Sequence, residues 1–137
     1  MPEKLIIYSD GGSRGNPGPA ALGVAIYDIK NPHDPIKIVS KFLGTATNNQ
    51  AEYHALIAAL QEAAKLKAKK IVCFLDSELV VRQLLGRYKV REHGLKSLAS
   101  EVLALQNSFE QIEFKHVVRE KNKLADSLVN EILDKNT

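Results

Sequence analysis

Four acidic side chains stand at places in the sequence where a carboxylate could do chemistry. Asp10 ends a short apolar run that predicts a buried strand, and Asp76 ends a second run of the same kind. Glu52 and Asp126 fall in the first turns of two predicted helices, where the helix dipole favours an ionised carboxylate. If the two strands are parallel neighbours, both aspartates emerge at the carboxyl edge of the sheet, where ligands bind in open α/β sheets. All four acids could therefore converge on one edge.

A cluster of carboxylates has a specific chemical consequence. Like charges repel, and without a cation some of the groups would have to hold a proton. Oxygen-rich sites that keep open positions suit Mg²⁺, and two such ions about 4 Å apart are the usual device for in-line hydrolysis of a phosphodiester. Each acid alone also has an ordinary explanation, as a turn residue after a strand or as a partner of a helix dipole. From the residues alone, the metal site and these structural roles both stay open.

The elements that must position these acids follow from the apolar patterning. Short runs rich in β-branched residues predict five strands, over Leu5–Ser9, Leu22–Ile29, Ile36–Leu43, Ile71–Leu75 and Gln111–Val117. Between the first two strands we predict a turn-rich loop, over Gly11–Pro19. Helical spacing of apolar residues predicts four helices, from Thr47 to about Leu66, over Ser77–Leu85 and Leu95–Leu105, and from about Asn122 to Leu133. Thr47 and Gln50 fit a capping box at the start of the first helix.

The order of these elements predicts an α/β fold. Three consecutive strands indicate an antiparallel meander, and the later alternation of strands and helices indicates parallel strands with crossover helices. A mixed five-stranded sheet flanked by helices satisfies both patterns. At 137 residues, 45% of them apolar, the chain suits one domain over residues 1–137.

Charge and composition indicate an acidic partner and no membrane. The formal net charge is +3, which favours nucleic acid without proving it. The stretch from Arg82 to Lys96 is basic, and its Arg87, Lys89 and Arg91 with Tyr88 could form a nucleic-acid contact, although a solvated basic surface fits equally well. The sequence has no run that resembles a signal peptide or a membrane span, so we expect a cytoplasmic protein.

Four motifs in the chain resemble the type 1 ribonuclease H family in their order and approximate spacing. They cover Tyr8–Pro19, Thr47–Tyr53, Asp76–Glu78 and Arg119–Asp126. The resemblance extends from about Leu5 to about Leu133 and implies a ribonuclease H-like fold. It also implies hydrolysis of the RNA strand of RNA–DNA hybrids, with two Mg²⁺ ions per site and with 5′-phosphate and 3′-hydroxyl products. Mn²⁺ could substitute for Mg²⁺. The implied partner is the hybrid itself, and we expect a monomer with no obligatory protein partner.

The same resemblance implies roles for individual residues. Asp10 would bridge both ions, Glu52 and Asp76 would hold the ion beside the leaving 3′ oxygen, and Asp126 would help to hold the ion that activates water. Contacts to the DNA strand and the minor groove are implied for Asn16, Thr47 and Asn48. Recognition of RNA 2′-hydroxyls, which distinguish RNA from DNA, is implied around Gly12, Ser13, Asn49 and Ser77. Turn and cap chemistry would explain many of the same residue types.

The chain departs from the family pattern in the loop before Asp126. Many family members carry a histidine there that is thought to help proton transfer or product release, but residues 118–122 contain none. Arg119 or Lys121 could substitute electrostatically, or the role could be absent. His116 lies in a predicted strand, where we expect a structural imidazole.

Two other classes of protein are alternatives to a nuclease. A catalytically silent hybrid-binding module is disfavoured because all four acids are present. An ATPase of the actin and Hsp70 kind shares the predicted topology, but 137 residues leave no room for its duplicated domains.

Overall fold

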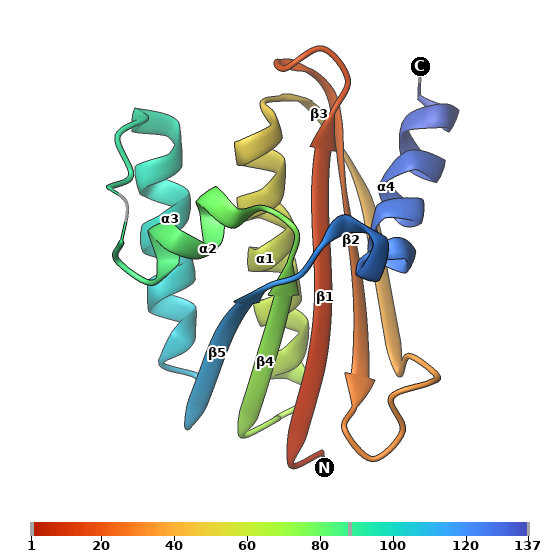
Figure 1. Ribbon diagram of the computed structural model, residues 1–137, viewed down its shortest axis with the longest axis vertical. Helices are drawn as coiled ribbons and strands as arrows, with labels where there is room; N and C mark the ends of the chain where they lie inside the picture. The colour runs from red at the N-terminus through yellow and green to blue at the C-terminus, as the bar shows by residue number, and fades with distance from the viewer. Residues whose placement is uncertain (1, 88, 137) are drawn as a thin grey trace.

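A computed structural model describes residues 2–87 and 89–136 (Figure 1). Its strands are β1 Lys4–Ser13, β2 Gly18–Asp28, β3 Lys37–Ala46, β4 Lys70–Leu75 and β5 Gln111–His116. Its helices are α1 Asn48–Lys65, α2 Glu78–Leu84, α3 His93–Gln106, the 3₁₀ turn η1 Arg119–Lys121, and α4 Lys123–Lys135. None of the helices in the described ranges combines the length and apolar character that a membrane span requires.

The five strands form one mixed sheet in the order β3-β2-β1-β4-β5. β1, β2 and β3 pair antiparallel, whereas β4 pairs parallel to both β1 and β5. Helices α1 to α3 lie on one face of the sheet, and α4 packs on the other face against β2 and β1 (Figure 1). The predicted α/β fold with a mixed five-stranded sheet is therefore confirmed.

The predicted loop over Gly11–Pro19 is wrong. β1 continues to Ser13 and β2 begins at Gly18, so the antiparallel pairing runs on to Ser13 opposite Ala20. A short turn over residues 14–17 joins the strands, and it is closed by the Arg14 N–H, which donates to the Pro19 carbonyl at 2.9 Å. Gly11 and Gly12 suggested a loop, but both lie in extended strand, and the backbone of α1 passes close to Gly11. Gly15, with a φ of 108°, lies in the turn itself.

The main core forms between the sheet and α1. Alternate residues of β1 and β4, such as Ile7 and Cys73, are fully buried against apolar side chains of α1, such as Leu56 and Leu60. Burial also raises the pKa of the Cys73 thiol, so this residue acts as a small hydrophobic side chain of the core. The start of α1 is fixed by the predicted capping box: Thr47 Oγ1 accepts from the Gln50 N–H at 3.1 Å, and Gln50 Oε1 accepts from the Thr47 N–H at 2.9 Å.

Two glycines let helices approach the sheet more closely than any side chain would allow. A Cβ atom at Gly11 would lie 2.2 Å from the backbone of Ala51 in α1. A Cβ atom at Gly23, which pairs with Asp10, would lie 2.5 Å from the Ala125 carbonyl oxygen in α4. Ala51 directly precedes Glu52, and Ala125 directly precedes Asp126. The two close approaches therefore bring the carboxylates of Glu52 and Asp126 near the end of β1.

We predict that Gly11→Ala destabilises the protein, because the helix backbone it would strike cannot move aside as a flexible side chain can. Overpacking of this kind costs about 1–3 kcal/mol in the free energy of unfolding, measured by chemical denaturation. Gly12→Ala is the matched control, since its Cβ would meet only Val129 Cγ1, at 3.3 Å. Equal stability of the two variants would contradict the close approach of α1.

Candidate active site

Three of the four predicted acids lie together at one edge of the sheet. Asp10, Glu52 and Asp76 can each offer one carboxylate oxygen such that these atoms lie within 4.8 Å of one another. The last parallel pair between β1 and β4 joins Ser9 to Leu75, so Asp10 and Asp76 follow it side by side. Glu52 reaches the same place from the first turns of α1. This is the convergence that strand and helix ends predicted.

The fourth acid, Asp126, lies at the same cleft but outside that group of three. It is half-buried in the first turn of α4 and interacts electrostatically with Asp10. Its Oδ1 accepts from Arg119 Nη2 at 3.2 Å, and its Oδ2 accepts from Asn130 Nδ2 at 3.4 Å. The structure therefore holds Asp126 beside the cluster with an ion pair of its own.

Burial and mutual repulsion set the protonation of the cluster. Asp10 and Glu52 are 7% and 5% exposed. Burial, followed by the charge of Asp76, raises the pKa of Asp10 from 3.8 to about 7. Burial, followed by the charge of Asp10, raises the pKa of Glu52 well above its ordinary value. Without a cation, the cluster therefore tends to hold a proton near neutral pH.

The donor set fits a divalent cation that prefers oxygen. Glu52 Oε1 accepts a short hydrogen bond from the Gly11 N–H, which fixes the carboxylate. The other oxygen, Oε2, is buried and has no hydrogen-bond partner among the described residues. A buried carboxylate oxygen left in this way is costly unless a cation or a proton satisfies it. An all-oxygen set of carboxylates beside an open cleft is the kind of site that Mg²⁺ uses.

The acids open into a cleft of about 410 Å³, which most of the predicted substrate contacts also line. The predicted substrate residues in the cleft wall are Gly12, Ser13, Asn48, Asn49 and Ser77. Asn16 and Thr47 do not line it. Thr47 is the cap of α1, and Asn16 Oδ1 accepts from the Asn48 N–H at 2.9 Å. The structural role foreseen for these two is thus observed, and their substrate contacts stay predictions.

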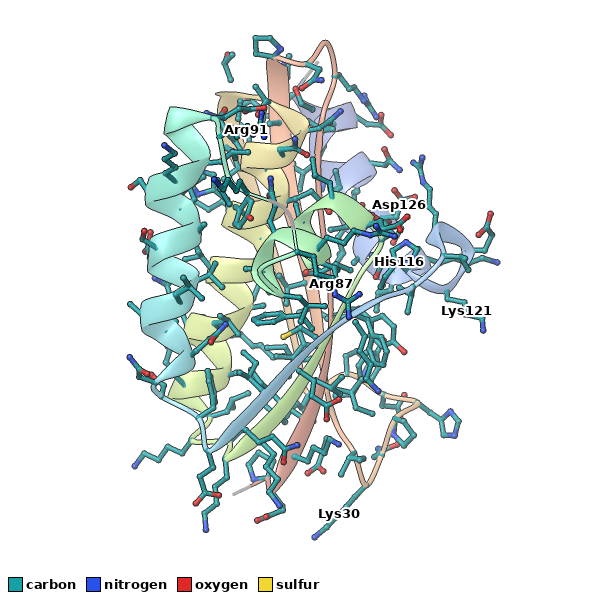
Figure 2. All side chains as sticks on the ribbon, turned by 60° about the vertical axis from the view of Figure 1, so that its left-hand side comes forward. Lys30, Arg87, Arg91, His116, Lys121 and Asp126 are labelled. Carbon is teal, nitrogen blue, oxygen red and sulfur yellow. The ribbon has the colours of Figure 1, made fainter. Side chains whose placement is uncertain are left out.

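The two cations of the short loop point to different places. Arg119 lines the cleft and pairs with Asp126, whereas Lys121 does not line the cleft. Figure 2 shows Lys121 extending outward from η1, away from Asp126. His116 ends β5, but its side chain is exposed, so the structure does not support the structural imidazole we expected.

The basic segment between α2 and α3 does not reach the cleft. Arg87, Lys89 and Arg91 are exposed and absent from the cleft wall. Figure 2 shows Arg91 close to the start of α3 and Arg87 well apart from Arg91, so these two side chains do not form one cluster. Tyr88, the predicted aromatic partner, lies outside the described residues. A nucleic-acid contact for this segment stays a prediction.

Asn122 is a site residue that the sequence analysis missed. It is 1% exposed, and its Nδ2 donates to the Ser9 carbonyl at 2.9 Å and to Asp76 Oδ2 at 3.4 Å. Its carbonyl also accepts the Asp126 N–H at 3.1 Å. Asn122 therefore ties the start of α4 to the ends of β1 and β4 and orients Asp76. One feature of the sequence could have indicated this role: Asn122 is an amide residue at the predicted start of a helix, one helical turn before Asp126.

Comparison with known proteins agrees with this geometry. The model of the family described as "Reverse transcriptase-like" matches residues 8–132. A bifunctional protein of Mycobacterium tuberculosis is 43% identical over 132 residues, which are 96% of this chain and 36% of that protein. Ribonuclease HI of Halobacterium salinarum is 41% identical over 127 residues, which are 93% of this chain and 63% of that protein. The solved structure of LC11-RNase H1 in complex with an RNA/DNA hybrid is 44% identical, covers 96% of this chain and 98% of that one, and superposes with a TM-score of 0.89.

The chain therefore belongs to the reverse transcriptase-like family and, within it, to the type 1 ribonuclease H group that its motifs resemble. This confirms the predicted family and the ribonuclease H-like fold. The chain spans about a third of the mycobacterial relative and less than two thirds of the archaeal one.

The raised pKa of Asp10 predicts how the metal-free protein responds to pH. The folded state keeps this carboxyl protonated up to about pH 7, whereas the unfolded chain releases the proton above about pH 3.8. The folded state thus binds more protons between these values, so the Asp10 contribution to the free energy of unfolding falls as pH rises from about 4 to about 7. One pKa unit corresponds to about 1.4 kcal/mol, so the loss is on the order of 4 kcal/mol.

Melting of the parent and of Asp10→Asn in a chelator, at pH 5 and pH 8, checks this. Asp10→Asn should melt higher than the parent at pH 8, and this advantage should shrink at pH 5, where the parent carboxyl is protonated. Added Mg²⁺ at pH 8 should close the gap by stabilising the parent. A difference between the two proteins that is the same at both pH values would count against the raised pKa.

Proposed function

We propose that the protein hydrolyses the RNA strand of RNA–DNA hybrids as an endonuclease, leaving 5′-phosphate and 3′-hydroxyl ends. The observation that carries this proposal is the convergence of Asp10, Glu52 and Asp76 within 4.8 Å, with Asp126 at the same cleft. Support comes from a relative named Ribonuclease HI and from the similar LC11-RNase H1, which was solved in complex with an RNA/DNA hybrid. The hybrid would be the partner, and no protein partner is needed for this chemistry.

Two Mg²⁺ ions per site are part of the proposal. Asp10, Glu52, Asp76 and Asp126 would hold them, with Mn²⁺ as a possible substitute. Bound there, the ions would supply Lewis acidity toward the attacking water and the leaving oxygen of the phosphodiester. The chain's own contribution is to hold the four carboxylates in place before metal and substrate arrive. Asn122 does so for Asp76, and the Gly11 N–H does so for Glu52.

Selection of the RNA strand is proposed for the cleft wall next to the acids. The Ser13 N–H donates to Asn48 Oδ1 at 2.7 Å, and the Asn48 N–H donates to Asn16 Oδ1 at 2.9 Å. This chain of bonds joins the β1–β2 turn to the start of α1, so it presents a stiff polar surface to a duplex. Asn49 and Ser77 flank the acids in the same wall. Their polar groups are suited to 2′-hydroxyls, which can both donate and accept.

The test is incubation with labelled RNA–DNA, RNA–RNA and DNA–DNA duplexes, with and without Mg²⁺. We expect cleavage of RNA in the hybrid alone, and only with the metal. Asp10→Asn should abolish cleavage but keep hybrid binding, because it removes a metal ligand and leaves the wall intact. Comparable cutting of DNA–DNA would contradict the proposed specificity. Hybrid binding by the parent without cleavage at any Mg²⁺ concentration would instead favour a silent binding module.

Arg119 is proposed to supply a fixed positive charge at the cleft in place of the missing loop histidine. Its ion pair with Asp126 places the guanidinium beside the acids, and the carboxylate raises its pKa further, so it stays charged throughout the working range. A fixed charge can stabilise the developing negative charge on the phosphate or help the product to leave. Lys121 points away and should contribute little.

We predict that Arg119→Ala lowers kcat by about tenfold, which is less than the loss expected for an enclosed donor because Arg119 is exposed to solvent. Lys121→Ala should change kcat much less, and Arg119→Lys should recover part of the loss. The pH–rate profile should show no separate bend near pH 6.5. Full activity in Arg119→Ala would remove the proposed role, and a bend that vanishes in His116→Ala would assign it to His116 instead.

A further inference from the structure

A second pocket lies on the sheet face that carries α4, next to η1. Its volume is about 310 Å³. The residues that line it are Tyr8, Tyr27, Pro32, Glu120, Lys121, Asn122, Lys123 and Leu124. It shares no lining residue with the active-site cleft, yet Asn122 connects the two, because this side chain lines the pocket and its Nδ2 donates to Asp76. The proposed function makes no use of this pocket.

The floor of the pocket belongs to a row of aromatic rings across three neighbouring strands. Tyr27 of β2 meets Tyr8 of β1 edge to face, with ring centroids 5.9 Å apart, and Tyr8 stacks on Phe74 of β4 at 5.1 Å. Strand alternation turns Tyr8 and Phe74 away from the core that Ile7 and Cys73 build against α1. All three rings are half-buried and so remain accessible to solvent on the α4 face. Aromatic side chains on the open face of a sheet are a surface on which unpaired nucleobases stack.

The rim of the pocket is cationic. Lys121 ends η1 and Lys123 begins α4, both side chains are exposed, and neither makes an ion pair with any residue in the described ranges. Glu120 is the one acid among the lining residues. Figure 2 shows the Lys121 side chain extending outward from η1 on the side away from Asp126. The aromatic floor suits the flat base of a nucleotide, and the lysines at its edge suit the charged phosphate.

We propose that this pocket binds one unpaired nucleotide of a single strand, with the base against Tyr27 and Tyr8 and the phosphate near Lys121 and Lys123. Because Asn122 lines this pocket and bonds to Asp76, a strand seated here would lie next to a duplex held in the active-site cleft. The pocket thus favours hybrids that carry a single-stranded extension over blunt hybrids. This last step rests on the proposed function, whereas binding of a single strand by the pocket does not.

Charge argues for nucleic acid over a protein surface in this pocket. A partner protein that covered the aromatic row with an apolar surface would bury Lys121 and Lys123, and burying an unpaired cation is costly. A phosphate backbone neutralises the same lysines and leaves them partly in water. The binding should therefore weaken with salt, as contacts to phosphates do.

Fluorescence anisotropy in an Asp10→Asn background, which prevents cleavage, tests the proposal. The probes are a blunt RNA–DNA hybrid, the same hybrid with a short overhang at each of its four strand ends in turn, and the overhang oligonucleotide alone. We expect at least one overhang to tighten binding by about fivefold or more, the lower end of what stacking of one base on one ring contributes. Tyr27→Leu should remove this gain without changing the affinity for the blunt hybrid. Tyr27→Phe keeps the ring and should keep the gain.

A charge-matched pair of variants tests the rim. Lys121→Gln with Lys123→Gln should reduce the overhang gain and lower the salt slope for that substrate by up to about 1.4, the value for two phosphate contacts on a single strand. Lys67→Gln with Lys69→Gln, in the turn after α1, removes the same charge elsewhere and should leave the gain intact. Melting curves of each variant show that it is folded.

The proposal is overturned if no overhang tightens binding, or if the gain survives Tyr27→Leu in a folded protein. The proposal is also overturned if both double lysine variants lose the overhang gain equally, because the gain would then depend on the overall charge of the protein and not on this pocket. Failure of the proposed function looks different: the parent would not cleave hybrids, but the isolated oligonucleotide would still bind in a manner that depends on Tyr27.

Discussion

Repulsion among buried carboxylates is the constraint on which the rest of the structure depends. Asp10 and Glu52 are almost fully buried, and each places a carboxylate oxygen within 4.8 Å of one from Asp76. Burial and like charge together raise the pKa values of Asp10 and Glu52. Such a cluster would spread apart if it were carried on flexible loops. The fold prevents this because the acids lie on separate elements, each of which packs in the core. The packing energy of these elements offsets the repulsion among the carboxylates.

Besides side-chain packing in the core, close backbone contacts bring together the elements that carry the acids. Gly11 and Gly23 sit on neighbouring strands and admit α1 on one face and α4 on the other. Asn122 then links the start of α4 to the ends of both parallel strands. Because each contact places a different carboxylate, loosening any one of them should let the carboxylates move apart. Their mutual repulsion would then fall, and the geometry of the cluster would be lost.

Local patterns in the sequence predicted the elements well but not the contacts between them. Apolar runs marked the strands, and Thr47 with Gln50 marked the start of α1, because strand alternation and capping are properties of adjacent residues. The Gly11–Pro19 stretch was misread as a loop because a glycine that admits a helix backbone has the same local signature as a glycine in a turn. The role of Asn122 and the row of Tyr8, Tyr27 and Phe74 depend on cross-strand register, which composition does not encode.

The short segment before α4 serves two surfaces at once. Arg119 turns toward the acids, Lys121 turns toward the aromatic pocket, and Asn122 is fixed between them by its bonds to Ser9 and Asp76. A loop histidine would place one titratable group at the cleft, whereas this segment places a cationic side chain on each side of the buried Asn122 amide. The aromatic pocket and the cluster of acids are therefore joined by one side chain, because Asn122 lines the pocket and its Nδ2 donates to Asp76.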